Sequence, residues 1–226
     1  MLLAMEFTYA DPTSTALFFL FAVAMFFLVH LTLIFKQPQK LWVFVNIILV
    51  FSFALLAFFG ITRANILPLA PILMASLFIV GILFSFSTGG KQLALKTPLY
   101  ILIGFQAFRF PLEILLHLWS DQGTIPETMT WTGSNFDILA GLLSLGSFYF
   151  VKNNKKLGYF VNAIGFVLLM NVLRVVIMSS PFPFSWPLDQ PLQLIFYFPY
   201  ALIAPSFVLP AFVGHLLVFQ RMRLAY

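Results

Sequence analysis

The sequence predicts an all-α membrane protein, a polytopic bundle of seven transmembrane helices that forms one domain over residues 1–226. Hydrophobic residues make up 62% of the chain and charged residues only 8%, whereas a soluble domain carries about 25% charged residues. The apolar residues are gathered into runs of about 20, the length that crosses a bilayer as a helix. The short alternating segments of an outer-membrane barrel are not seen.

The seven predicted spans differ in their composition. The first three are continuous apolar runs without Lys, Arg, Asp or Glu. The fourth is apolar apart from a stripe of ionisable residues, the fifth is short, and the last two are interrupted by polar residues or prolines. In chain order we predict helices at residues 14–35, 41–60, 67–87, 98–119, 136–151, 157–178 and 197–220.

The charged residues of the connections predict the orientation. The cations gather in alternate connections and after the last span, at Lys36, Lys40, Lys91, Lys96, Lys152, Lys155, Lys156, Arg221 and Arg223. The connections on the other side hold acids, with Arg63 as the one basic exception. The positive-inside rule therefore predicts an external N-terminus and a cytoplasmic C-terminus. The net charge of +5 reflects this topology and does not indicate nucleic-acid binding. Short connections favour a bacterial inner membrane.

A local similarity suggests an internal repeat. Residues 40–48, at the start of the second span, match residues 156–164, at the start of the sixth, at six of nine positions. Both stretches follow a basic connection, and the third and seventh spans both contain prolines. The pattern predicts a 3+1+3 parallel pseudo-repeat, an arrangement found in some transporters. Chance is the alternative, since Phe, Val, Ile and Leu dominate the chain.

The fourth span carries the clearest functional signal. Arg109, Glu113 and His117 are spaced i, i+4 and i+8, and Gln106 precedes Arg109 by three positions, so the four share one face of a helix. An ionisable side chain inside a membrane is costly unless it is paired or faces a cavity. The stripe therefore indicates either an internal site or a structural ion network.

Four further polar residues are expected at similar depth in the outer half of the bundle. Asn135 and Asp137 lie at the start of the fifth span, and Asn171 and Arg174 lie in the sixth. With Arg109, Glu113 and His117, they predict an outward-facing polar pocket that binds and transports a small polar or anionic solute. The two arginines would hold the anion. Glu113 and His117 would exchange a proton, and the other three residues would orient the ligand.

Three alternatives remain open at this point. In the structural alternative, Arg109 pairs with Glu113 and Arg174 pairs with Asp137. In the second, the protein is a membrane enzyme that acts on a lipid or headgroup near the outer leaflet, with Glu113, His117 and Asp137 as acid–base groups. In the third, it is an accessory subunit whose partner is another membrane protein or a second copy. The chain contains no Gly-x-Ser-x-Gly, His-Glu-x-x-His or phosphate-loop motif, so no catalytic residue is assigned.

His30 and His215 are candidate axial ligands of a b-type haem, because each lies six residues before a cation at the cytoplasmic end of its span. The alternative is that each imidazole bonds within the protein. The chain has no cysteine, so thiolate metal sites are excluded, and no other metal or cofactor is expected.

Four stretches resemble an uncharacterised family of small multi-pass bacterial inner-membrane proteins. They are residues 108–113, 125–141, 180–183 and 215–221, and the second is the most specific. The resemblance covers about the last three fifths of the chain. It implies a bacterial inner-membrane protein and carries no activity with it.

Overall fold

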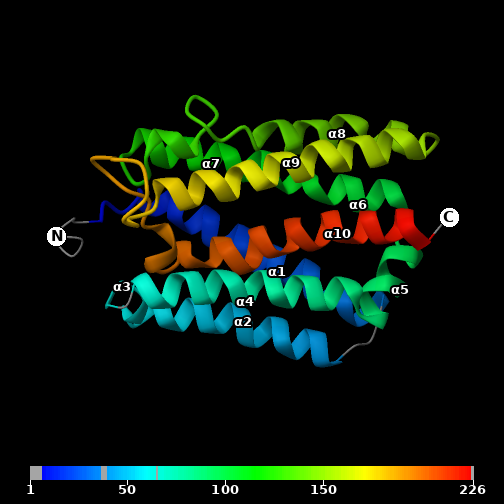
Figure 1. Ribbon diagram of the computed structural model, residues 1–226, viewed down its shortest axis with the longest axis horizontal. Coiled ribbons are helices and arrows are strands. Elements are labelled where there is room, and N and C mark those ends of the chain that lie inside the picture. Colours follow the sequence, from blue (N-terminus) through cyan, green and yellow to red (C-terminus); the bar gives the residue numbers. More distant parts are fainter. Residues whose placement is uncertain (1–6, 37–39, 65, 225–226) are drawn as a thin grey trace.

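The computed structural model describes residues 7–36, 40–64 and 66–224, and all regular structure within them is helical. The long helices lie side by side in one bundle (Figure 1). The α-helices are α1 (Pro12–Lys36), α2 (Lys40–Phe58), α3 (Ile61–Ala64), α4 (Ile66–Phe86), α5 (Thr88–Lys96), α6 (Leu99–Phe105), α7 (Arg109–Asp121), α8 (Ile138–Val151), α9 (Lys155–Ser179) and α10 (Leu209–Leu224). Short 3-10 turns are η2 (Gln106–Phe108), η3 (Glu127–Met129), η4 (Leu194–Phe196) and η5 (Tyr200–Leu202), and η6 (Ala204–Val208) is a π-helical turn.

Six helical segments of the described chain are long and apolar enough to cross a membrane. They are α1, α2, α4, the continuous run α6–η2–α7, α9, and the run from Tyr200 through α10. The fifth predicted span corresponds to α8, which has 14 residues and so extends only about 21 Å. A helix of that length falls short of the hydrocarbon core of about 30 Å. The protein is thus a polytopic helical membrane protein, while the count of seven spans stays a prediction.

Two short helices stand where the sequence predicted only connections, namely α3 and α5. The start of α5 is stabilised by Ser87, whose hydroxyl accepts a hydrogen bond from Gly90 N at 3.2 Å. Gly90 lies so close to the carbonyls of Phe84 and Ser85 that a Cβ would overlap them. Glycine there allows the chain to turn directly from α4 into α5.

The bundle has two chemically distinct ends, which we call the basic end and the acidic end. The basic end is formed by the start of α2, by α5, by the α8–α9 connection and by the end of α10, and it carries Lys40, Lys91, Lys96, Lys152, Lys155, Lys156, Arg221 and Arg223. The acidic end carries Asp11, Asp121, Glu127 and Asp189. Figure 1 shows the labelled C-terminus and α5 together at the basic end.

The run that ends in α10 forms the centre of the bundle. Within its apolar stretch 72% of the residues are buried, compared with 17–44% in the other five spans. It packs against α4, α5, α6 and α9. The outward surfaces of the remaining helices carry large exposed side chains such as Leu20, Phe44, Phe51 and Leu145, which contact the lipid bilayer. The expected pseudo-repeat stays a prediction, and its first helices differ in length, 25 residues in α1 against 14 in α8.

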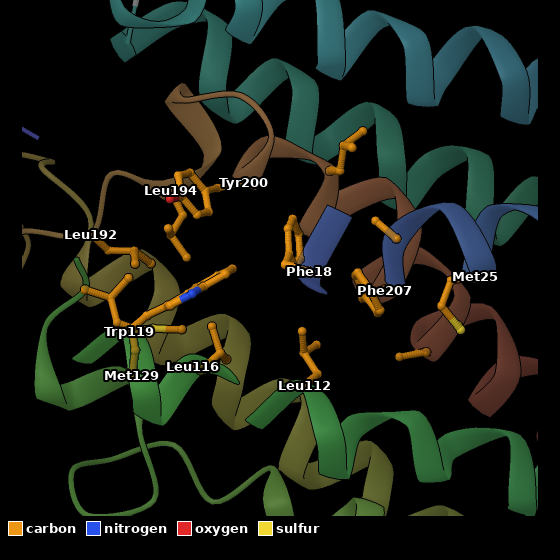
Figure 2. Close-up of a cluster of buried hydrophobic side chains, with 14 of the residues drawn as sticks. Phe18, Met25, Leu112, Leu116, Trp119, Met129, Leu192, Leu194, Tyr200 and Phe207 are labelled. Atoms are coloured by element: carbon orange, nitrogen blue, oxygen red, sulfur yellow. The ribbon is translucent and has the colours of Figure 1, made fainter. Parts of the chain in front are cut away.

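An aromatic core closes the acidic end. Trp119 is fully buried and packs in T-shaped arrangements with Phe18 and Tyr200, at centroid distances of 5.1 and 5.0 Å (Figure 2). Its indole Nε1 donates to Ser14 Oγ at 3.1 Å, so the one polar atom of the ring is satisfied. Tyr200 accepts a hydrogen bond from Ala10 N at 3.1 Å. These contacts tie α1, α7 and η5 together beside the polar site.

Candidate functional site

The segment from residue 122 to residue 137 builds one side of the candidate site. It contains only the short turn η3 and occupies the half of the bundle that α8 does not reach (Figure 1). Thr124, Ile125, Met129 and Thr130 are buried, and the segment is bound to α9 by a hydrogen bond of 2.7 Å between the hydroxyls of Thr128 and Ser179. Non-helical backbone is tolerated at membrane depth when protein covers it. The segment thereby brings the start of α8 into the interior.

Arg109 and Asp137 meet at that point. Arg109 is 1% exposed at the junction of η2 and α7, and Asp137 is 5% exposed directly before α8. Arg109 Nε donates to Asp137 Oδ2 at 2.6 Å, and Nη2 pairs with Oδ1 of the same carboxylate. The pairing is bidentate, the arrangement that suits a guanidinium and a carboxylate.

The third guanidinium nitrogen faces α9 and α10. Arg109 Nη1 donates to Gly165 O and contacts His215 Nε2, each at 3.1 Å. A guanidinium has only donors, so His215 Nε2 accepts and the ring proton lies on Nδ1, which donates to Asn162 Oδ1 at 2.9 Å. A Cβ on Gly165 would come within 2.8 Å of the His215 ring, so glycine allows this close approach. All three nitrogens of Arg109 are therefore engaged within the protein.

Glu113 lies one turn beyond Arg109 on α7 and is 2% exposed. Both of its carboxyl oxygens lie 3.0 Å from Asn135 Nδ2, which also donates to Met129 O. Asn135 Oδ1 in turn accepts from the backbone N–H of Asp137 at 3.0 Å. Asn135 thus links Glu113 to the ion pair, but Glu113 itself has no direct cationic partner, because Arg109 is bound to Asp137.

His117 continues the same face of α7 toward the acidic end, where it borders a hollow. Its ring stacks on Trp131 at a centroid distance of 4.0 Å, and its Nδ1 is buried without a hydrogen-bond partner. The hollow has a volume of about 460 Å³, and its ionisable or amide-bearing lining residues are His117, Asp121, Glu127 and Gln190. His117 therefore lines the polar hollow and lies one turn beyond the buried Glu113 on α7.

Asn171 and Arg174 lie apart from this network. Asn171 Nδ2 donates to Ser134 O at 2.8 Å, which secures the 122–137 segment against α9. Arg174 is exposed, donates to Asn171 Oδ1 at 3.0 Å and lies over the Trp186 ring. The structure thus brings together Arg109, Glu113, Asn135 and Asp137, with His117 at their outer edge, and leaves Arg174 at the surface.

The alternative ion pairs expected from the sequence are wrong. Arg109 pairs with Asp137 rather than with Glu113, and Arg174 bonds an amide rather than Asp137. The reason is the path of the 122–137 segment, which turns Asp137 toward α7. The ion pair of Arg109 and Asp137 is the one salt bridge found among the described residues.

The structure also bears on the two histidines considered for haem. Both ring nitrogens of His215 have protein partners, so neither is free to bind iron in this arrangement. His30 Nδ1 donates to Phe26 O at 2.7 Å, and its Nε2 has no partner. Within the described part of the chain, no group of three or more His, Asp or Glu side chains is placed to hold a metal ion.

The sequence pattern did not assign His215, Asn162 or Gly165 to the network. Each is a single polar or small residue in an apolar helix, and single residues carry no periodic signal. The sequence did place Gln106 on the same face as Arg109, because it precedes Arg109 by three positions. It is buried and donates from Nε2 to Ala211 O at 3.0 Å, a second tie between this region and the central helix.

Comparison of the chain with protein-family models, with curated proteins and with solved structures found no match. The resemblance to a family of bacterial inner-membrane proteins therefore stays a prediction, and the site is interpreted from its own geometry.

Proposed function

We propose that this protein binds a small polar solute in the hollow at its acidic end and transports it across the membrane together with a proton. The observation that carries the proposal is the position of His117, which lines the polar hollow one helical turn from the buried carboxyl group of Glu113. A solute in the hollow and a proton on Glu113 would then both act on the imidazole of His117.

Charge balance supports the proton-binding part of the proposal. The buried network holds one guanidinium and two carboxyl groups, and the guanidinium is bound bidentately to Asp137. A second negative charge on Glu113 would have only the amide of Asn135 as a hydrogen-bond donor. An uncompensated charge is costly in a membrane interior, and a proton removes that charge.

Local departures from α-helical geometry near the network support transport over a static role. The chain passes through the 3-10 turn η2 directly before Arg109 and through the π-turn η6 before α10. Before α8 it passes through the 122–137 segment, in which η3 is the one regular turn. Transporters commonly form their substrate sites from discontinuous helices near the membrane midplane.

The lining of the hollow favours a neutral or cationic solute over the anion expected from the sequence. Arg109 is saturated by internal partners, whereas the exposed carboxylates of Asp121 and Glu127 border the hollow. Like charges repel an anionic ligand at close range. The binding residues proposed here are His117, Thr132 and Gln190, with Asp121 and Glu127 as counter-charges.

A flux assay in proteoliposomes tests this function. The probes are glucose, glycine, choline, ethanolamine and acetate, each supplied with and without an inward proton gradient. We expect a proton-dependent current with a neutral or cationic probe and none with acetate. Conversion of a lipid headgroup without flux would instead support the membrane-enzyme alternative, and the absence of both flux and binding by the whole panel would contradict the proposal.

The matched variant is His117→Phe, which keeps an aromatic ring to stack on Trp131 and removes both ring nitrogens. His30→Phe is the control, because it makes the same change on α1, away from the hollow. We expect flux to be lost in His117→Phe and kept in His30→Phe.

We also propose that the protein lies in a bacterial inner membrane with its basic end in the cytoplasm. The distribution of lysines at that end supports this orientation. The chain has no cysteine, so single cysteines can be introduced without a background thiol. Cysteines at Lys155 and at Glu127 should react with a membrane-impermeant maleimide from the cytoplasmic and the external side, respectively; the reverse labelling would refute the orientation.

A further inference from the structure

His215 is a buried titratable residue to which the proposed function assigns no role. It is 1% exposed on α10, and its ring packs in a T-shaped arrangement with Phe166 of α9. Its hydrogen-bond partners are Arg109 at 3.1 Å and Asn162 at 2.9 Å. Histidine is the side chain whose ordinary titration range lies closest to neutral pH. An imidazole bonded to the guanidinium of a proton-binding network is therefore a candidate for a part in proton binding.

Glu113 and His215 lie in opposite halves of the bundle. Glu113 is eight residues before the end of α7 at the acidic end, a rise of about 12 Å. His215 is nine residues before the end of α10 at the basic end, a rise of about 14 Å. Figure 1 shows α7 and the end of α10 toward opposite ends of the bundle. Hydrogen bonds join Glu113 to Asn135, Asn135 to Asp137, Asp137 to Arg109 and Arg109 to His215.

Arg109 is the one charged side chain that bonds the His215 ring in the described part of the chain. The elements that pack against α10 are α4, α5, α6, α9 and η6. Of these, α4, α6 and η6 contain no Asp, Glu, His, Lys or Arg. The cations of α5 and α9 are exposed, namely Lys91, Lys96, Lys155, Lys156 and Arg174. The protonation of His215 therefore depends on Arg109 and on the carboxyl groups that Arg109 balances.

Counting charges shows that one proton has two suitable positions in the network. With Arg109 positive and both carboxyl groups ionised, the network holds one uncompensated negative charge, which is costly in a membrane interior. A proton on Glu113 with a neutral His215 removes that charge. A proton on His215 with an ionised Glu113 leaves the total charge equally balanced. Asp137 is less suited to hold the proton, because both of its oxygens already accept from Arg109.

The hydrogen bonds of His215 suit it to gain a proton on Nε2. Asn162 Oδ1 accepts from the Nδ1–H of the ring whether the ring is neutral or protonated, so the ring is held in both states. Arg109 Nη1 loses its acceptor at Nε2, but it keeps Gly165 O at 3.1 Å. The two adjacent cations then repel each other, and the guanidinium is drawn to the ionised Glu113, one turn along the same helix. Arg109 thus has a carboxylate partner in either state.

We propose that His215 is the second binding site of the transported proton, on the basic side of Glu113. The O–H bond of the Glu113 carboxyl group breaks and an N–H bond forms at His215 Nε2. The carboxyl group becomes a carboxylate, the imidazole becomes an imidazolium, and the net charge of the network is unchanged. This assignment rests on the proposed transport function, and it supplies the position from which the proton leaves toward the basic end.

A comparison of two transport modes in proteoliposomes tests the assignment. Net uptake driven by a proton gradient requires the proton to bind and to leave, whereas exchange of labelled for unlabelled solute without a gradient does not. The probe is whichever of glucose, glycine, choline and ethanolamine the wild type carries fastest. His215→Gln keeps an acceptor oxygen for Arg109 but has no group that binds a proton at neutral pH. We expect this variant to lose gradient-driven uptake and to keep exchange.

Two further variants separate proton binding from support of the fold. Glu113→Gln removes the other position of the proton and should show the same pattern. The double variant Glu113→Gln/His215→Gln should be no worse than either single variant, because residues that act as a unit have non-additive effects. His30→Gln makes the matched substitution on α1, where the ring bonds Phe26 O of its own helix, and should keep both transport modes.

The possible results distinguish this assignment from the proposed function. If His215→Gln keeps gradient-driven uptake while Glu113→Gln loses it, the assignment of His215 is overturned and the proposed function stands. Loss of both uptake and exchange in His215→Gln also overturns the assignment, because the imidazole then only supports the fold. If the wild type carries none of the probes, the proposed function is wrong, and the second proton site is wrong with it.

Discussion

Arg109 and Asp137 form a buried bidentate ion pair in which Arg109 Nε lies 2.6 Å from Asp137 Oδ2. The pair joins the start of α7 to the start of α8, two points separated by 28 positions in the chain. Asp137 lies directly before α8, so the ion pair holds the start of this short helix against α7. The pair thereby positions the 122–137 segment, which carries Asn135 and borders the hollow.

Removing one partner of this pair should destabilise the protein strongly. We expect Arg109→Leu to lower the free energy of unfolding by about 3–5 kcal/mol, because it leaves the Asp137 carboxylate buried and unpaired. Arg109→Lys keeps the charge but loses the bidentate geometry, so its effect should be smaller. Denaturant titration in detergent, followed by tryptophan fluorescence, provides the measurement. The double variant Arg109→Leu/Asp137→Leu should recover much of the loss; if it is no more stable than the single variant, the charge is not the cause.

Asn135 should be important to the network through its three hydrogen-bonded contacts. Asn135→Ala removes the donor to Glu113 and to Met129 O, and it removes the acceptor for Asp137 N. Leaving buried polar groups unsatisfied costs about 1–3 kcal/mol, and we expect a loss of that size in the same titration. Asn153→Ala, at an exposed position in the α8–α9 connection, is the control and should change stability by less than about 0.5 kcal/mol.

Replacing either of two glycines of α8 by alanine should change the stability of the protein, but in opposite directions. A Cβ on Gly141 would overlap the backbone of Phe110, whereas a Cβ on Gly146 would meet nothing within 4 Å. Gly141→Ala should therefore push α8 away from α7 and destabilise by about 1–3 kcal/mol. Gly146→Ala should stabilise by about 0.5–1 kcal/mol, because alanine has the better helix propensity. Equal thermal unfolding temperatures for the two variants would contradict the close packing of α8 on α7.

The lowered pKa of Asp11 predicts that its contribution to the stability of the fold is lost at acid pH. Hydrogen bonds from the Ser14 hydroxyl and backbone N–H, and then from Gln122, lower the pKa of Asp11 from 3.8 to about 2. A pKa that is lower in the folded state means that the contribution is fully present above pH 3.8 and is lost as the pH falls through about 2. Asp11→Asn should therefore unfold at a lower temperature than the wild type at pH 7, and the difference should vanish near pH 2. Asp189→Asn, at an exposed site, should match the wild type at pH 7.

The positions of the membrane-spanning helices could be predicted because each depends on a local property. A run of about 20 apolar residues must satisfy its backbone groups internally, and a helix does so within the run itself. Six of the predicted spans correspond to helical segments that are long enough to cross a membrane. The same local logic missed α5, because its composition is polar and its start depends on how Ser87 and Gly90 meet the end of α4.

The candidate site was predictable only in part, as Glu113 illustrates. Helical spacing placed Arg109, Glu113 and His117 on one face of α7, and the structure keeps them there. Spacing along one helix does not reveal which neighbouring element that face meets. For that reason Arg109 was expected to pair with Glu113, whereas its carboxylate partner is Asp137, and the contact with His215 could not be read from α10 alone.

By itself, the sequence determined that this chain is a helical membrane protein, where its long spans lie, and that α7 carries ionisable groups in the membrane. These properties follow from composition and helical periodicity, which act over one or a few turns. Only the tertiary structure decided that Asp137 holds Arg109, that His215 joins them and that Arg174 stays at the surface. Those contacts depend on the path of the 122–137 segment and on close helix packing at Gly141 and Gly165, where elements distant in the chain are brought within hydrogen-bonding distance.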